Sequence, residues 1–260
     1  MMKRKLQKCL TVLGMIGLCI GFSGCGKSKD TAAESSVPLE KGEHITYGSY
    51  QGEAIEWRVL DKKDDEVLLI SEYGLDAQPF DTSGKDRVLW KDSTIRKWLN
   101  NDFYNSAFSE EEKENIVLSY SEGFEENNNS IHPMGGKPNA HLERETEDKL
   151  FLLSYTELVQ YFAESPGMGY YELWRGYDEL LCYPTEYAKQ QLEPLYKTDA
   201  CAWWLCNPQY DTGDGFSNHV EVITAFGTRE AAQMMNTRRY AVRPAMWVTW
   251  QSDMQAIDSE

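Results

Sequence analysis

Short apolar runs alternate with turn residues at the start of the folded part of this chain. β-Rich runs occupy residues 45–47, 55–60 and 67–71; two glycines separate the first two runs, and a charged stretch at 61–66 separates the last two. β-Branched and aromatic residues bounded by turn residues are typical of strands. The pattern predicts an antiparallel meander of three strands.

Helical periodicity follows the meander. At residues 93–103 apolar side chains recur three and four positions apart, which predicts a helix with one apolar face. Capping boxes, in which a serine and a glutamate satisfy backbone N–H groups at a helix start, begin at Ser109 and Ser154. Pro184 is expected to open a short helix that runs to Gln191, because proline is well tolerated in a first helical turn.

The rest of the chain is again rich in strand-like runs. We expect strands at 148–153, 202–205, 219–225 and 239–248. Together the elements indicate one α+β domain over residues 43–250, with short helices and a mixed or antiparallel sheet in which strands from both ends of the chain meet. A C-terminal tail, 251–260, follows this domain.

The N-terminus carries an export signal. Four basic residues precede an apolar run at 10–22, and Phe22-Ser23-Gly24-Cys25 closes it, as in a bacterial lipoprotein signal peptide. A transmembrane helix is the alternative, but the run is shorter than the ~20 residues that cross a bilayer. We expect cleavage after residues 1–24, a lipid on Cys25 and a flexible tether at 25–42. The protein would then be extracytoplasmic, anchored to the outer face of the bacterial cell membrane.

The charge restricts the partners. The chain has a formal charge of −16, and loss of the four basic residues in the signal takes it to −20. Such a surface repels nucleic acid phosphates and anionic lipid headgroups. The sequence therefore argues against nucleic acid as a partner, and for contact with the membrane through the anchor alone.

Several motifs give the chain a family resemblance. They fall in the same order as those of a bacterial domain-of-unknown-function family numbered 6273. The motifs are 55–60 (IEWRVL), 69–80 (LISEYGLDAQPF), 95–104 (IRKWLNNDFY), 148–154 (DKLFLLS), 182–188 (CYPTEYA), 203–205 (WWL) and 242–247 (VRPAMW). The family pattern continues Trp-Trp-Leu with Arg-Ser-Pro, whereas Cys206-Asn207-Pro208 follows here. The resemblance covers nearly all of the chain after the signal and is almost silent about function, because the family has no established activity.

A more distant likeness concerns the order of elements. Pro184-Thr185-Glu186 before a helix, a Trp-rich strand and a closing Val242-Arg243 resemble the C-type-lectin-like fold of formylglycine-generating enzymes. The spacing of Cys201 and Cys206 is similar to the copper-binding thiol pair of those enzymes, which makes an exported enzyme of this type the alternative function. Residues five apart on a regular strand point to opposite faces, however. Packing, or one disulfide involving Cys182, is the other interpretation of these cysteines.

Catalytic motifs find little support elsewhere. The chain has no His-Glu-x-x-His, no Gly-x-Ser-x-Gly and no phosphate-binding loop. The favoured hypothesis is therefore a non-catalytic binding or interaction domain, whose partner is a glycan or another cell-surface ligand.

No cofactor is expected for the favoured binding domain, and calcium is the alternative. Asp211 and Asp214 lie in a Gly-Asp turn, and Glu221 follows Gly215 by six residues, as in the second half of a calcium loop. The first acidic ligands of such a loop are missing, so an EF-hand is not supported. A looser oxygen-ligand site and a solvated turn are the two interpretations.

A glycine-rich aromatic segment is the candidate ligand site. Tyr170, Tyr171, Trp174 and Tyr177 lie in an irregular stretch where a regular core explains them least. Flat rings cover the apolar face of a sugar, which favours a glycan surface. A local hydrophobic plug is the alternative.

One arginine stands in apolar surroundings. Arg243 precedes Pro244 in the closing strand-like segment. We expect it to be buried against a carboxylate or backbone carbonyls and to be structural, because a buried guanidinium needs such partners.

Overall fold

The computed structural model describes residues 39–85, 88–120, 146–162, 176–209, 219–232, 235–251, 254 and 256–257, all within one unit, Ser36–Glu260. None of the helices in these ranges is long and apolar enough to cross a membrane. Of the expected site residues, Cys25, Tyr170, Tyr171, Trp174, Asp211 and Asp214 lie outside the described ranges.

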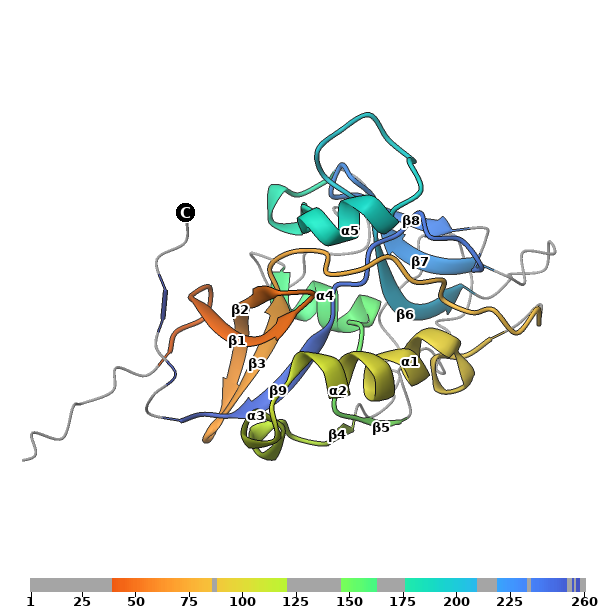
Figure 1. Ribbon diagram of the computed structural model, residues 1–260. Helices are drawn as coiled ribbons and strands as arrows, with labels where there is room; N and C mark the ends of the chain where they lie inside the picture. Colours follow the sequence, from red (N-terminus) through yellow and green to blue (C-terminus); the bar gives the residue numbers. More distant parts are fainter. Residues whose placement is uncertain are drawn as a thin grey trace, which may run out of the picture. The chain divides into compact units, whose positions relative to one another are not determined.

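A four-stranded antiparallel sheet contains the predicted meander. Its strand order is β1 (His44–Tyr50), β2 (Glu53–Lys63), β3 (Glu66–Ser71) and β9 (Ala245–Thr249) (Figure 1). The β1–β2 connection is a two-residue turn with positive φ at both positions, which matches the right-handed twist of a hairpin. Because β9 pairs with β3, the prediction that strands from both ends of the chain meet in one sheet is confirmed.

A second antiparallel sheet is built from the last third of the chain. It has the order β6 (Trp203–Gln209), β7 (His219–Ile223) and β8 (Arg229–Ala232). Two of these strands were predicted, and β8 was not. The expected strand at 239–248 is wrong in its first half. There, residues 241 and 242 form only isolated bridges to other parts of the fold. These sheets and the short helices confirm the α+β class.

The predicted helix at 93–103 is present and extends further. It comprises α1 (Thr94–Trp98), a π-helical turn η2 (Leu99–Phe103) and α2 (Tyr104–Ala107), after a 3-10 turn η1 (Trp90–Asp92). The capping box at Ser109 is confirmed at α3 (Glu110–Asn115), where the backbone N–H of Glu112 donates to the Ser109 hydroxyl and the Glu112 carboxylate accepts from the Ser109 N–H.

The later short elements follow the same local rules. The capping box at Ser154 is confirmed at α4 (Tyr155–Phe162). Another 3-10 turn, η3 (Asp178–Leu180), precedes α5 (Glu186–Gln191), which is capped by Thr185 directly after Pro184. The expected strand at 148–153 is reduced to a two-residue pairing of β4 (Ser119–Tyr120) with β5 (Glu147–Asp148) and a single bridge at Phe151.

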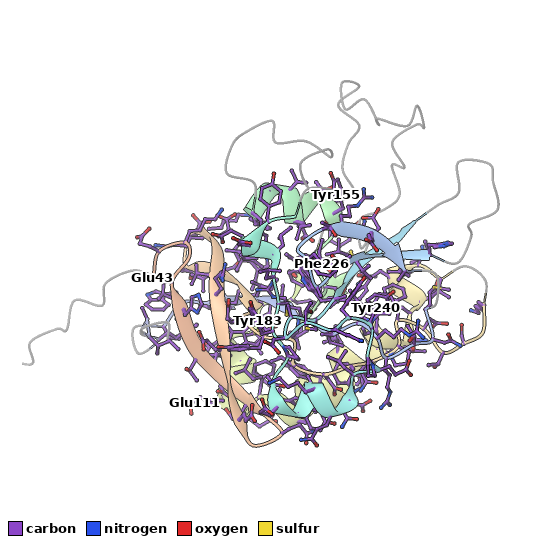
Figure 2. All side chains as sticks on the ribbon, turned by 90° about the horizontal axis from the view of Figure 1, so that it is seen from above. Glu43, Glu111, Tyr155, Tyr183, Phe226 and Tyr240 are labelled. Atoms are coloured by element: carbon purple, nitrogen blue, oxygen red, sulfur yellow. The ribbon has the colours of Figure 1, made fainter. Side chains whose placement is uncertain are left out.

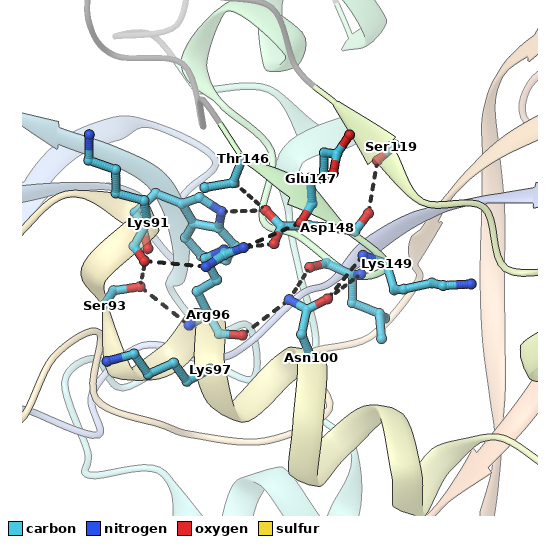
Figure 3. A network of polar contacts seen from close by, with 12 residues as sticks. Lys91, Ser93, Arg96, Lys97, Asn100, Ser119, Thr146, Glu147, Asp148 and Lys149 are labelled. Atoms are coloured by element: carbon cyan, nitrogen blue, oxygen red, sulfur yellow. Dashed lines mark hydrogen bonds and ion pairs between the residues drawn. The ribbon is translucent and has the colours of Figure 1, made fainter.

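A polar network joins the helical segment to β5. The buried carboxylate of Asp148 accepts hydrogen bonds from Trp90 Nε1 at 2.8 Å, Arg96 Nε at 2.7 Å and Thr146 Oγ1 at 2.5 Å (Figure 3). Asn100 closes the network, because its Oδ1 accepts backbone N–H groups of residues 149 and 150. Each carboxylate oxygen has a donor, so this burial costs little and holds the elements in register.

The core explains most of the tryptophans. Trp57, Trp203 and Trp204 are fully buried, and Trp98 and Trp247 pack against the core from its edge. The tryptophans in the regular elements therefore serve the core. Exposed aromatic rings in turns are therefore the ones that need another explanation.

Candidate functional site: an exposed aromatic surface and a buried thiol cluster

The turn between β7 and β8 presents an aromatic ring to solvent. The turn is closed by backbone bonds from Gly227 N–H to the Thr224 carbonyl at 3.0 Å and from Thr224 N–H to the Thr228 carbonyl at 2.7 Å. At its tip the Phe226 side chain is 57% exposed. Its ring meets that of Tyr196 edge to face, with centroids 5.2 Å apart. A rigid turn thus displays a ring that would ordinarily be buried.

Two glycines hold this turn against a neighbouring segment. A Cβ on Gly227 would lie 2.2 Å from the Tyr177 carbonyl oxygen, and one on Gly176 would lie 2.5 Å from the Phe226 carbonyl oxygen. Both glycines have positive φ, and the Tyr177 N–H donates to the Gly227 carbonyl at 3.3 Å. Only glycine allows such a close backbone approach. The predicted site residue Tyr177 is thereby fixed beside Phe226.

A carboxylate acts on the Tyr196 phenol of this ring pair and on a second phenol, Tyr240. Burial, then the nearby charge of Glu230, raises the pKa of Tyr196. Burial also raises the pKa of Tyr240, an effect that Arg239 opposes and Glu230 reinforces. The exposed Glu230 carboxylate is therefore close enough to act on both phenols. Phe226 and Tyr240 are labelled in Figure 2.

We use the term aromatic surface for Tyr177, Tyr196, Phe226, Glu230 and Tyr240. The Tyr240 ring packs on the buried Trp204 ring at 4.4 Å, so the surface rests directly on the core. Rings with hydroxyl groups and a carboxylate nearby suit a ligand with an apolar face and a hydroxylated rim.

Of the predicted calcium ligands, the structure describes Glu221. It is buried on β7, and its two carboxylate oxygens accept hydrogen bonds from the Nε and Nη2 atoms of Arg229, the first at 3.0 Å. This pairing gives Glu221 a structural role within the sheet. The described part of the chain holds no group of three or more His, Cys, Asp or Glu side chains suited to a metal ion. Calcium binding by Asp211, Asp214 and Glu221 stays a prediction.

The cysteines that contact each other are not the pair that the sequence suggested. Cys182, Cys201 and Cys206 are all buried and reduced. The Cys201 thiol meets Cys182, whose carbonyl oxygen lies 3.4 Å from Cys201 Sγ. Cys206 lies further along β6, where its backbone N–H donates to the Leu153 carbonyl. The alternative pair Cys201/Cys206 stays a prediction, whereas the contact between Cys182 and Cys201 is part of the structure.

Arg243 is close enough to these two thiols for its charge to favour a lower pKa for both. Its side chain is 0% exposed, its Nε donates to the Ser71 carbonyl at 2.8 Å, and its guanidinium stands over the Trp203 ring at 5.1 Å. The prediction that Arg243 is buried against a backbone carbonyl is confirmed. We name Cys182, Cys201 and Arg243 the thiol cluster.

The two thiols of this cluster differ in acidity. Burial raises the pKa of Cys182, but a hydrogen bond from Cys201 and the charge of Arg243 outweigh burial, so the net shift is downward. The hydrogen bond to Cys182, followed by burial, raises the pKa of Cys201 well above the ordinary thiol value. Cys182 is thus the more acidic thiol of the pair and Cys201 the less acidic one.

Sequence reasoning missed Tyr196, Phe226 and Tyr240. The available signal was an aromatic residue directly before a glycine at the end of a predicted strand, as in Phe226-Gly227. Such a residue leaves the alternating face of the strand and enters the turn. The contact of Tyr196 with Phe226 depends on how the segment after α5 folds back, and no local sequence pattern predicts this.

Three comparisons bear on the identity of the chain. A family model described as Domain of unknown function (DUF6273) matches residues 64–250. The match includes the aromatic surface and the thiol cluster. A search of curated proteins found no match, and neither did a search of solved structures.

Proposed function

This chain belongs to the DUF6273 family, a domain of unknown function, and from that premise we propose that it is a lipid-anchored extracytoplasmic binding protein. Its aromatic surface takes a neutral glycan, and the domain is non-catalytic. The signal at residues 1–24 and Cys25 support the anchor.

The exposed ring of Phe226 carries the proposal. The ring is exposed to solvent on a turn whose position is fixed by close backbone contacts at two glycines. The position of the ring therefore does not depend on a ligand. A preformed ring loses little conformational entropy when a ligand covers it. The Tyr196 ring meets the Phe226 ring at 71° and adds a second apolar wall beside it. The exposed Phe226 face is flat and apolar, which suits the face of a pyranose.

The polar groups around the rings favour a hydroxylated ligand. Glu230 accepts hydrogen bonds, and the phenols of Tyr196 and Tyr240 both donate and accept them. Their raised pKa values keep both phenols protonated at neutral pH. The net charge, −16 for the whole chain and −20 after loss of the four basic residues of the signal, and the nearby Glu230 carboxylate repel anionic sugars, so a neutral one is preferred.

A fluorescence titration tests this function. Trp204 lies against Tyr240, so its emission reports events at the aromatic surface. We expect a saturable change with at least one neutral glycan from a panel and a smaller response to its sulfated analogue. The difference should shrink at high salt, because added ions screen the charge of Glu230. A panel in which no neutral glycan gives a saturable response would contradict glycan binding.

A further inference from the structure

The backbone brings Cys182 and Cys201 into disulfide range. The Cys201 N–H donates to the Cys182 carbonyl at 2.8 Å. One backbone N–H···O=C bond of this length holds the two Cα atoms roughly 5–6.5 Å apart, which is within the span that disulfides use. No rearrangement of the chain is needed to bring the two side chains together.

Both sulfurs also border the same small space. A Cβ placed on Gly74 would lie 3.3 Å from Cys201 Sγ and 3.5 Å from Cys182 Sγ. Gly74 is fixed there, because its N–H donates to the Tyr183 carbonyl and its carbonyl accepts from the Thr185 N–H. The absence of a side chain at this position leaves the two sulfurs room to approach each other.

Arg243 supplies the charge that activates one of them. Within the described residues its Nη1 and Nη2 atoms have no hydrogen-bond partner. The nearest carboxylate, Glu72, is 3.8 Å from Nη2, but its two oxygens already accept from Arg58 at 2.9 and 3.0 Å. A buried guanidinium without a bonded anion is costly. The charge of Arg243 lowers the pKa of Cys182, so a thiolate formed on Cys182 would partly offset this charge.

We propose that Cys182 and Cys201 form a redox-active dithiol that a small disulfide oxidant closes to a disulfide, with Cys182 as the nucleophile. The Cys182 thiolate attacks one sulfur of the oxidant and releases a first thiolate, which leaves a mixed disulfide on Cys182. Cys201 then loses its proton and attacks the Cys182 sulfur, which releases the second thiolate. Two electrons pass to the oxidant, which leaves as two thiols.

The disulfide has a structural consequence. It closes a loop of roughly 20 residues that contains α5 and Tyr196, and a cross-link of this length restricts the unfolded chain enough to raise Tm by roughly 5–10 °C. Because Cys182 is buried, the reaction proceeds through local opening or during folding and is slow in the native protein. Cys206 takes no part in this disulfide.

Peptide mapping tests the pairing. The full chain, purified reduced, is incubated with oxidised glutathione, alkylated and digested with trypsin without reductant. We expect peptides 176–189 and 198–229 to be joined, and Tm to rise and return after reduction. Because Cys201 and Cys206 share the second peptide, the same experiment on Cys206→Ser assigns the bond: the link should persist there and disappear in Cys201→Ser.

The mixed disulfide tests the nucleophile. Cys201→Ser should accumulate glutathione on Cys182, whereas Cys182→Ser should carry several-fold less on Cys201. The proposal is overturned if peptides 176–189 and 198–229 stay separate after native oxidation and after oxidation during refolding, or if the link is lost in Cys206→Ser. Equal glutathione loading in the two single variants would contradict the claim that Arg243 activates Cys182 as the nucleophile.

Discussion

Aromatic rings gather at two places in this molecule, with opposite exposure. Under the meander, the Phe103 ring lies 4.8 Å from Tyr50, 5.4 Å from Trp98 and 6.2 Å from Phe108, and Phe108 is only 4% exposed. At the β7–β8 turn, Phe226 is 57% exposed and has Tyr196 as its ring neighbour. Identical side chains therefore serve the core in one region and remain available to a ligand in the other.

The difference arises from the backbone that carries each ring. Phe103 belongs to a helix whose apolar stripe faces the sheet, so periodicity buries it. Phe226 stands at a turn that backbone contacts with Gly176 and Tyr177 hold in place. Hydrophobicity alone does not decide where a ring lies. The local fold decides whether its area stabilises the protein or is left for binding.

The largest expected loss of unfolding free energy follows substitution of the buried arginine. Arg243→Ala removes a fully buried guanidinium and leaves the Ser71 carbonyl without its donor, so unfolding should become easier by about 3–5 kcal/mol. Denaturant unfolding measures this loss. Arg238→Ala, at an exposed arginine, is the control and should stay within about 0.5 kcal/mol of the parent. A structural role for Arg243 is refuted if both variants unfold at the same midpoint.

Alanine variants of one buried and one exposed phenylalanine compare how much each ring contributes to the free energy of unfolding. Phe108→Ala opens a cavity in the buried cluster and should cost about 3–5 kcal/mol of unfolding free energy. Phe226→Ala loses an exposed ring and one edge contact, so its cost should stay below about 1 kcal/mol. Equal losses in the two variants would show that Phe226 belongs to a hydrophobic plug, and the aromatic surface would then not be a binding site.

Substitution at the lipid anchor should have the smallest effect on the two aromatic regions of the folded domain. Cys25→Ala removes the thiol that accepts the lipid, so the protein should leave the membrane fraction or remain unprocessed. Fractionation with fatty acid labelling measures this. Tm of the folded domain should not change, since residue 25 lies outside Ser36–Glu260. A processed, unlabelled variant that still partitions with membranes would contradict lipid anchoring.

Local patterns predicted the elements better than the contacts between them. The strands of the meander and the capping boxes at Ser109 and Ser154 depend on near neighbours in the sequence, and the structure confirms them. The short strand β8 carries no alternation long enough to recognise. The contact of Cys182 with Cys201 requires the segment before α5 to fold against the start of β6, which is a tertiary event.

The most direct test of glycan binding compares two exposed aromatic residues. Phe226 is 57% exposed at the aromatic surface, and Tyr120 is 56% exposed on β4. With the neutral glycan that gives the strongest fluorescence response, isothermal titration of the parent, Phe226→Ala and Tyr120→Ala measures the contribution of each ring. We predict about tenfold weaker binding for Phe226→Ala, equivalent to about 1.4 kcal/mol, and parent affinity for Tyr120→Ala. Parent affinity in Phe226→Ala, or an equal loss in both variants, would contradict a binding site at this surface.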